Sequence, residues 1–330
     1  MKKILLIHTG GTFGMMPAKP SSYLVPADIQ DLITKHLPEI KKIAHVEFEV
    51  AFNIDSSDIQ IDHWVKMARI MSKNYNKYDG FVIIHGTDAM IYTACALSFM
   101  LKGLAKPVIL TGSQRPLALI RSDARSNLIN SIELATLDIP EVSICFGTNL
   151  FRGNRTIKIS STSYQAFTSP NFPALAEVGW EISLSDNILP SGKHLTVLDQ
   201  FNNDVFCFRF FPGLLPKYLN WLIDSPIKGV VIEALGMGNI AIKENSLISW
   251  IEQINKHNKI VVINSQNPYG KINLSLYKCG KMITDAGGIT AGDMTTAASI
   301  IKLMHLLGYH KKEFNKVKEK FLKPLAGEIS

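Results

Sequence analysis

The chain has few cysteines, and none of them is placed to form a metal site or a redox pair. Cys95, Cys145, Cys207 and Cys279 stand at least fifty residues apart, with no C-x-x-C pair and no histidine at metal-ligand spacing. Structural zinc sites and disulfide scaffolds need such spacing. The sequence therefore predicts reduced cysteines that serve packing, and no metal centre.

Long hydrophobic runs are also absent. The first residues, Met1–Ile7, resemble the start of a signal peptide, but the apolar run stops at His8 and Gly10 before a full hydrophobic region forms. No stretch approaches the roughly 20 apolar residues that a membrane helix needs. These absences predict a cytoplasmic protein without a membrane partner.

The glycine patterns of nucleotide-binding proteins are incomplete. The first apolar run leads into Thr9-Gly10-Gly11-Thr12, whereas a dinucleotide fingerprint requires glycine at position 9 and a P-loop requires a following G-K-[ST]. The chain has no internal repeat and no low-complexity segment either. Nucleotide binding is therefore the weaker interpretation of these glycines.

The composition is that of an ordinary globular protein. The chain has 330 residues, of which 46% are hydrophobic, so it can bury a large core, and its length favours two domains. A net charge of +7 would suit RNA, but lysines outnumber arginines 28 to 7 and lie scattered along the chain. We therefore expect no nucleic-acid partner.

Two short apolar runs end in the same kind of turn. The first leads to the Gly10-Gly11-Thr12 turn, and Phe81-Val82-Ile83-Ile84 leads to His85-Gly86-Thr87-Asp88. Continuous apolar runs are typical of parallel strands buried on both faces, and ligands bind outside the carboxyl ends of such strands. We therefore predict that Thr12 and Thr87 converge at one edge of a sheet. For the first turn alone, an ordinary turn with a solvated threonine is an equal alternative.

A third polar group follows a strand-like segment. Asp55, Ser56, Ser57 and Asp58 follow the alternating sequence 46–52. Their carboxylates and hydroxyls are suited to bind the charged end of an amino acid. They are equally suited to form an Asx-rich turn that caps the next helix.

Two further candidates come from a loop and from a basic segment. Residues 15–27 hold three prolines around Tyr23, which predicts a mobile loop whose tyrosine closes over substrate or is a plain surface aromatic. Lys158 ends a basic segment in an otherwise apolar and hydroxyl-rich context. It is a candidate catalytic partner, and a surface cation is the alternative.

Periodicity sets the fold class and the domains. Strands and helices alternate along the first half of the chain, which predicts an α/β fold with a parallel sheet. The segment from 181 to 205 loses this periodicity and gathers turn-forming residues, as a linker does. We predict an N-terminal domain over 1–185, a linker over 186–204 and a C-terminal α/β domain over 205–330.

Three helices are predicted with particular features. The segment Asp28–His36 begins at an N-cap aspartate, Leu214–Ile223 has helical spacing, and the charged tail 311–321 suits a solvated amphipathic helix.

The candidate residues together suit acyl transfer by a threonine nucleophile. A threonine hydroxyl needs a base, and Lys158, held by Asp88, can take a proton from Thr87, which then attacks or aids attack on an amide carbonyl.

These motifs resemble the L-asparaginase family, an asparaginase/glutaminase-like group of amidohydrolases, and within it the cytoplasmic type I branch. The resemblance rests on the two threonine turns, the 55–58 cluster and the segment Arg152-Gly153-Asn154-Arg155-Thr156-x-Lys158, and extends to Gly236-Met237-Gly238-Asn239. It implies hydrolysis of L-asparagine to L-aspartate and ammonia through an acyl-enzyme, without a cofactor.

The resemblance also implies roles for individual residues. Thr12 would be the nucleophile, Tyr23 would assist it, and Thr87, Asp88 and Lys158 would handle protons. The amino-acid end of the substrate would be bound by Asp55, Ser56 and Ser57 together with Thr87 and Asp88.

At the level of the whole protein, the resemblance implies a larger N-terminal domain with a flavodoxin-like sheet and a smaller C-terminal domain. It also implies a homodimer or homotetramer. Some type I relatives bind asparagine at a second, effector site that uses an arginine and a cysteine. This chain has Glu233 at the first position and Asn267 or Pro268 at the second, which predicts that the effector is not bound there.

Two other functions are compatible with these motifs. An archaeal-type amidotransferase subunit that acts on charged tRNA shares them but carries an extra N-terminal domain, whereas the first motif here begins at residue 9. A non-catalytic amino-acid binding module on the same scaffold is the second alternative, although the full set of Thr12, Thr87, Asp88 and Lys158 favours an enzyme.

Overall fold

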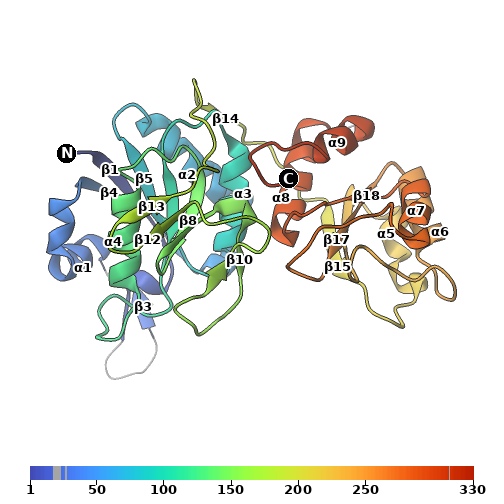
Figure 1. Cartoon of the computed structure of the whole chain (residues 1–330), viewed down its shortest axis with the longest axis horizontal. Coiled ribbons are helices and arrows are strands. Elements are labelled where there is room, and N and C mark those ends of the chain that lie inside the picture. Colours follow the sequence, from blue (N-terminus) through green and yellow to red (C-terminus); the bar gives the residue numbers. More distant parts are fainter. Residues whose placement is uncertain (18–23, 27, 312) are drawn as a thin grey trace. The chain divides into compact units, whose positions relative to one another are not determined.

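The computed structural model describes residues 1–17, 24–26, 28–311 and 313–330 of the chain (Figure 1). The chain divides into two compact units, unit 1 over Met1–Asp199 and unit 2 over Gln200–Ser330. The segment 186–204, predicted as a linker, contains this division, and its first part belongs to unit 1.

Unit 1 is built on an eight-stranded sheet with the order β13-β12-β9-β8-β7-β5-β1-β4. Strands β4, β1, β5, β7 and β8 are parallel to one another, and β9, β12 and β13 continue the sheet in antiparallel fashion. The strands are β1 (Lys3–Gly10), β4 (His45–Ile54), β5 (Gly80–Ile84), β7 (Val108–Thr111), β8 (Val142–Phe146), β9 (Asn149–Arg152), β12 (Ala176–Val178) and β13 (Ile182–Leu184).

The order of the parallel strands confirms the predicted flavodoxin-like sheet. If the five parallel strands are numbered by their order in the sequence, they lie side by side in the sheet as second, first, third, fourth and fifth. The order reverses between β1 and β5, which pair in parallel with His8 opposite Ile84. In such sheets the ligand site lies beyond the carboxyl ends of the strands at the reversal. This topology puts the turns after β1 and β5 next to each other.

Helices cover both faces of this sheet (Figure 1). Side chains of α1 and α4 share one hydrophobic core with alternate residues of the central strands, such as Ile4, Leu6, Val82 and Ile84. The other face of the sheet is covered by α2 and α3. Because both faces are covered, Ile4–Ile7 are almost completely buried, which explains the continuous apolar run. The helices are α1 (Ile29–His36), α2 (Ile61–Asn74), α3 (Met90–Met100) and α4 (Ala124–Leu134).

Helix α1 begins as the sequence predicted. The side chain of Asp28 accepts a hydrogen bond from the backbone N–H of Asp31, which is an N-cap contact.

Short elements complete unit 1. They are β2 (Met15–Pro17), β3 (Leu24–Pro26), β6 (Leu101–Lys102), β10 (Ile157–Lys158), β11 (Phe167–Thr168), β14 (Thr196–Val197) and the 3₁₀ helices η1 (Thr12–Gly14), η2 (Pro38–Lys42), η3 (Ser56–Asp58) and η4 (Gly153–Arg155).

Unit 2 has a four-stranded parallel sheet in the order β15-β16-β17-β18. Its elements are β15 (Val205–Arg209), β16 (Gly229–Ala234), β17 (Ile260–Ser265), β18 (Ile289–Thr290), α5 (Trp221–Asp224), α6 (Ile248–Lys256), α7 (Lys278–Asp285), α8 (Thr296–Tyr309), α9 (Phe314–Phe321) and the 3₁₀ helix η5 (Pro216–Leu219). This smaller α/β unit confirms the predicted fold class for the C-terminal part.

The helix predicted over Leu214–Ile223 is wrong as a single element. The segment contains η5, which begins at Pro216, and the short α5, which ends at Asp224. Proline disfavours the helical conformation at the residue before it, and Leu215 is extended with a ψ of 128°, so the helical turn begins at Pro216.

No helix in the described parts of the chain is long and apolar enough to cross a membrane.

Candidate active site

The turns that follow the central strands of unit 1 touch one another through glycines. A Cβ atom added to Gly11 would lie 2.6 Å from the Cα of Gly86, and one added to Gly86 would lie 2.7 Å from the Oγ of Ser56. Gly11 also has a φ of 85°, which L side chains rarely adopt. Glycine at both positions therefore lets the two threonine turns and the 55–58 cluster meet at one edge of the sheet.

Thr12 lies on a turn anchored in the core. The next residue, Phe13, is fully buried, and its carbonyl accepts a hydrogen bond from the N–H of Leu117 at 3.1 Å. Full burial of a phenylalanine side chain contributes about 1.5–3 kcal/mol, so the turn is firmly held. The hydroxyl of Thr9, the other threonine of this motif, donates to the carbonyl of Ile84 at 2.9 Å and ties β1 to β5. Of the two, Thr12 is the one left half-buried at the edge.

Three of the predicted residues are joined by hydrogen bonds. The Nζ of Lys158 donates to the Oγ1 of Thr87 at 2.9 Å and to the Oδ1 of Asp88 at 2.6 Å. The side chain of Lys158 is 14% exposed, whereas that of Asp88 is 73% exposed. The amine therefore approaches the threonine hydroxyl from the protein side, and the carboxylate lies open to solvent.

Lys158 is positioned by a well-buried segment that precedes it. Arg152 forms a buried ion pair with Glu141, in which its Nε lies 2.6 Å from Oε2. The guanidinium of Arg152 also lies 4.2 Å from the ring centre of Phe172, and Lys158 itself is in β10, opposite Phe167. Arg152 is thus a structural group of this basic segment.

Gln114 joins the site, and the sequence analysis did not single it out. Its Nε2 donates to the carbonyls of Ser160 and Ser163 at 3.3 and 3.2 Å, and its Oε1 lies 3.4 Å from the hydroxyl of Thr87. The backbone of Gln114 is fixed by the buried carboxylate of Asp123, which accepts its N–H. One signal was available: Thr111-Gly112-Ser113-Gln114 ends a third apolar strand in a turn like the other two.

The 55–58 cluster forms an Asx-type turn, which is one of its two predicted alternatives, and its predicted part in substrate binding stays a prediction. The Oδ1 of Asp55 accepts hydrogen bonds from the N–H and the hydroxyl of Ser57, each at 2.8 Å, and these two bonds lower the pKa of Asp55. Asp55 thereby caps η3 rather than α2. Ser56 is buried against Gly86, and its Oγ accepts the N–H of Ala89 at 3.3 Å. Asp55 and Ser57 remain exposed at the same edge.

Tyr23 lies outside the described residues, so its predicted role stays a prediction. In the described residues, no group of three or more histidine, cysteine, aspartate or glutamate side chains is arranged to hold a metal ion.

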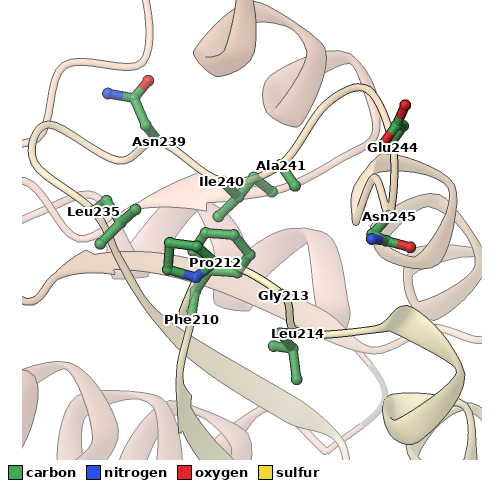
Figure 2. Close-up of a pocket in the computed structure, with 10 residues that line it drawn as sticks. All are labelled: Phe210, Pro212, Gly213, Leu214, Leu235, Asn239, Ile240, Ala241, Glu244 and Asn245. Atoms are coloured by element: carbon green, nitrogen blue, oxygen red, sulfur yellow. The ribbon is translucent and has the colours of Figure 1, made fainter.

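A cavity of about 360 Å³ lies in unit 2 (Figure 2). Its walls are apolar side chains such as Phe210, Pro212 and Ile240, with Glu244 at one end and Asn239 at the other. None of the predicted catalytic or substrate-binding residues is among the described residues that line it. Its size alone therefore does not make it the site of the reaction.

Comparison with known proteins assigns both units to one family. Residues 3–189 match the family described as "Asparaginase, N-terminal", and residues 204–321 match "Glutaminase/Asparaginase C-terminal domain". The chain belongs to the asparaginase family. The resemblance inferred from the sequence motifs is thereby confirmed.

Individual relatives agree with this assignment. The chain is 34% identical to L-asparaginase 1 of Escherichia coli over 336 residues, which cover 100% of this chain and 98% of that protein. It is 34% identical to a glutamyl-tRNA(Gln) amidotransferase subunit of Pyrococcus abyssi, covering 100% of this chain and 77% of that protein. It is also 34% identical to the L-asparaginase of Dirofilaria immitis, but it spans only 60% of that longer protein.

A solved structure has the same fold throughout. The crystal structure of L-asparaginase I from Vibrio cholerae superposes with a TM-score of 0.91 at 34% sequence identity, covering 100% of this chain and 99% of that one. The fold similarity thus extends over both units of this asparaginase-family chain.

Proposed function

We propose that this chain hydrolyses L-asparagine to L-aspartate and ammonia through an acyl-enzyme on Thr12. The observation that carries the proposal is the hydrogen-bonded group of Lys158, Thr87 and Asp88 at the strand edge where the Thr12 turn also lies. Family membership supports hydrolysis of an amide as the reaction class, because several relatives are named L-asparaginase.

The proposed reaction has two steps. The Thr12 hydroxyl oxygen attacks the side-chain amide carbon of asparagine and gives up its proton, and the C–N bond breaks as ammonia leaves with a proton. Water then attacks the resulting ester and releases aspartate. In both steps a proton must move, and the contact between the Thr87 hydroxyl and the Lys158 amine offers a short path for it.

The groups around the threonines are proposed to orient the substrate. Asp88 is exposed and anionic, so it can meet the α-ammonium group of asparagine, and the hydroxyls of Ser56 and Ser57 with the Asp55 carboxylate complete the proposed binding set. Tyr23 is proposed to assist Thr12 from the loop. The reaction needs no cofactor in this scheme.

The experiment is an assay of ammonia release with asparagine and glutamine as separate substrates. We expect turnover of asparagine by the wild-type protein and its loss in Thr87→Val. Thr136→Val is a matched control, because the hydroxyl of Thr136 donates to a carbonyl of its own chain segment, that of Glu133. A wild-type protein that binds asparagine without releasing ammonia would instead be a binding module.

The relationship to the Pyrococcus amidotransferase protein supports a second candidate function. In that case ammonia release from glutamine would depend on a partner protein and a charged tRNA. Free asparagine turnover by the isolated chain, unchanged by added tRNA, separates the two functions.

We further propose that the protein is cytoplasmic and forms a homodimer or homotetramer. The four cysteines are free, which suits a reducing compartment. Sedimentation equilibrium at two protein concentrations would give the oligomeric state.

A further inference from the structure

Three hydrogen bonds connect buried side chains to the peptide just before Thr87. The indole Nε1 of Trp64 donates to the Oγ1 of Thr93 at 3.0 Å, and the same oxygen lies 2.9 Å from the Nε2 of His85. The Nδ1 of His85 lies 2.7 Å from the carbonyl oxygen of Gly86. All three side chains are at most 5% exposed. They come from α2, α3 and the end of β5, so the path joins the helical layer to the site.

The direction of each bond follows from the atoms. An indole N–H can only donate and a carbonyl can only accept, so Thr93 accepts from Trp64, and the Nδ1 of His85 must carry hydrogen. Burial lowers the pKa of His85 from its ordinary value of 6.5 to about 4, against a smaller opposing effect of the Gly86 bond. The ring is thus neutral at neutral pH, its Nε2 is an acceptor, and the Thr93 hydroxyl donates to it. All bonds point one way, from Trp64 through Thr93 and His85 to Gly86.

The end point of this path is the Gly86–Thr87 peptide, whose carbonyl accepts from His85. Gly86 has no side chain, and it lies between Gly11 and Ser56 at distances that leave no room for a Cβ. A trans peptide holds its C=O and N–H in opposite directions, so a bond to the Gly86 carbonyl also sets the direction of the Thr87 N–H. The Thr87 hydroxyl belongs to the residue whose N–H is oriented in this way.

We propose that His85 is a positioning residue for the reaction, and that Thr93 and Trp64 hold it in the Nδ1–H tautomer in which it fixes the Gly86–Thr87 peptide. This inference rests on the proposed function, because it assigns Thr87 a part in the chemistry. His85 itself touches no substrate in this scheme.

The kinetic test compares Thr93→Val with Thr93→Ser. Valine keeps the shape but removes the donor to His85, whereas serine keeps the hydroxyl. We expect kcat for asparagine to fall about 10- to 100-fold in Thr93→Val, since misplacement of a reacting group by about 1 Å costs about that factor, with KM within about threefold of wild type. Thr93→Ser should restore kcat to within about threefold.

The spectroscopic test reads the tautomer directly in the wild-type protein. In protein labelled with ¹⁵N-histidine, the His85 signals, assigned by their loss in His85→Asn, should show a protonated Nδ1 and an unprotonated Nε2. In Thr93→Val this preference should weaken. An Nε2–H tautomer in the wild-type protein would overturn the inference.

The two proposals fail in different ways. If the wild-type protein releases no ammonia from asparagine, the proposed function fails. If the wild type is active and Thr93→Val keeps its kcat while only its melting temperature falls, the function stands, and His85 and Thr93 are merely structural.

Discussion

Two lysine–carboxylate pairs of similar length lie in very different surroundings. In unit 1, Lys158 lies 2.6 Å from Asp88, with side chains 14% and 73% exposed. In unit 2, Lys302 lies 2.5 Å from Glu328, and both side chains are 0% exposed. The same two chemical groups are open to a small molecule in one case and sealed from water in the other.

The other partners of the two lysines differ as well. Lys158 also bonds the hydroxyl of Thr87, a group that can exchange a proton. Lys302 also bonds the carbonyl of Lys323, which accepts hydrogen bonds but has no proton to exchange at neutral pH. The Glu328 carboxylate in turn accepts the N–H groups of Leu325 and Ala326. The buried pair therefore holds the C-terminal segment in place, whereas the open pair has the surroundings of a reactive group.

The first test removes the proposed reactive groups one at a time. We expect Thr12→Ala, Thr87→Val and Lys158→Met each to lower asparagine turnover by several orders of magnitude without unfolding the protein, because each removes a member of the proposed proton-transfer unit. Steady-state ammonia release and circular dichroism would be measured together. Near-normal turnover in any of the three would remove that residue from the mechanism.

The second test removes the lysine of the buried pair. Lys302→Met leaves the Glu328 charge buried without its partner, which typically costs about 3–5 kcal/mol, so urea denaturation should show a large loss of stability. At temperatures where the variant is folded, kcat should be unchanged. Lys256→Met, which breaks an exposed pair with Glu252, is the matched control and should cost less than about 1 kcal/mol. Restoration of stability by the double variant Lys302→Met with Glu328→Leu would confirm that the lone charge is the cause; equal stability of Lys302→Met and wild type would contradict it.

A third prediction concerns buried histidines that are neutral at neutral pH. Burial lowers the pKa values of His8, His85 and His305 from 6.5 to about 4. Below pH 6.5 the unfolded chain binds protons that the folded chain does not, so the stability present above pH 6.5 should be lost as pH falls toward 4, by about 1.4 kcal/mol per histidine for each pH unit. Urea midpoints measured from pH 7.5 to 4.5 test this. A flat profile over this range would refute the prediction.

The smallest effect is expected at a third pair, Arg209 with Glu233. The Glu233 carboxylate lies 3.3 Å from the Nε of Arg209, and its other oxygen accepts from the hydroxyl of Thr296 at 2.9 Å. An acid already bonded within unit 2 repels the carboxylate of an effector amino acid. We expect hyperbolic dependence of rate on asparagine, measured over a wide concentration range. A Hill coefficient well above one that is abolished by Glu233→Ala would contradict this.

The sequence predicted the parts of the fold and site that depend on local pattern. The buried runs at 4–7 and 81–84 indicate parallel strands because both of their faces are apolar, and the threonines follow because both strands end alike. Asp28 marks the start of α1 through its cap. Each of these signals lies within a few residues of the feature that it predicts.

The remainder depends on which segments become neighbours. Gln114 reaches the site only because β7 lies beside β5, and Thr93 reaches His85 only because α3 packs over the same strand end. Lys302 sits in an apolar helix, where its partner lies 26 residues further on, so no local pattern marks the pair. Helix α7 was not predicted at all, since Gly280 lies within it and glycine disfavours helices.

The proposed acyl-enzyme on Thr12 is most directly tested by partitioning with hydroxylamine. Asparagine and the β-methyl ester of aspartate would be supplied separately, and the ratio of β-aspartyl hydroxamate to aspartate would be measured for each. If both substrates form one ester on Thr12, the two ratios will be equal at every hydroxylamine concentration, and Thr12→Ala will form neither product. Different ratios for the two substrates, or normal product formation by Thr12→Ala, would contradict a common acyl-enzyme on this residue.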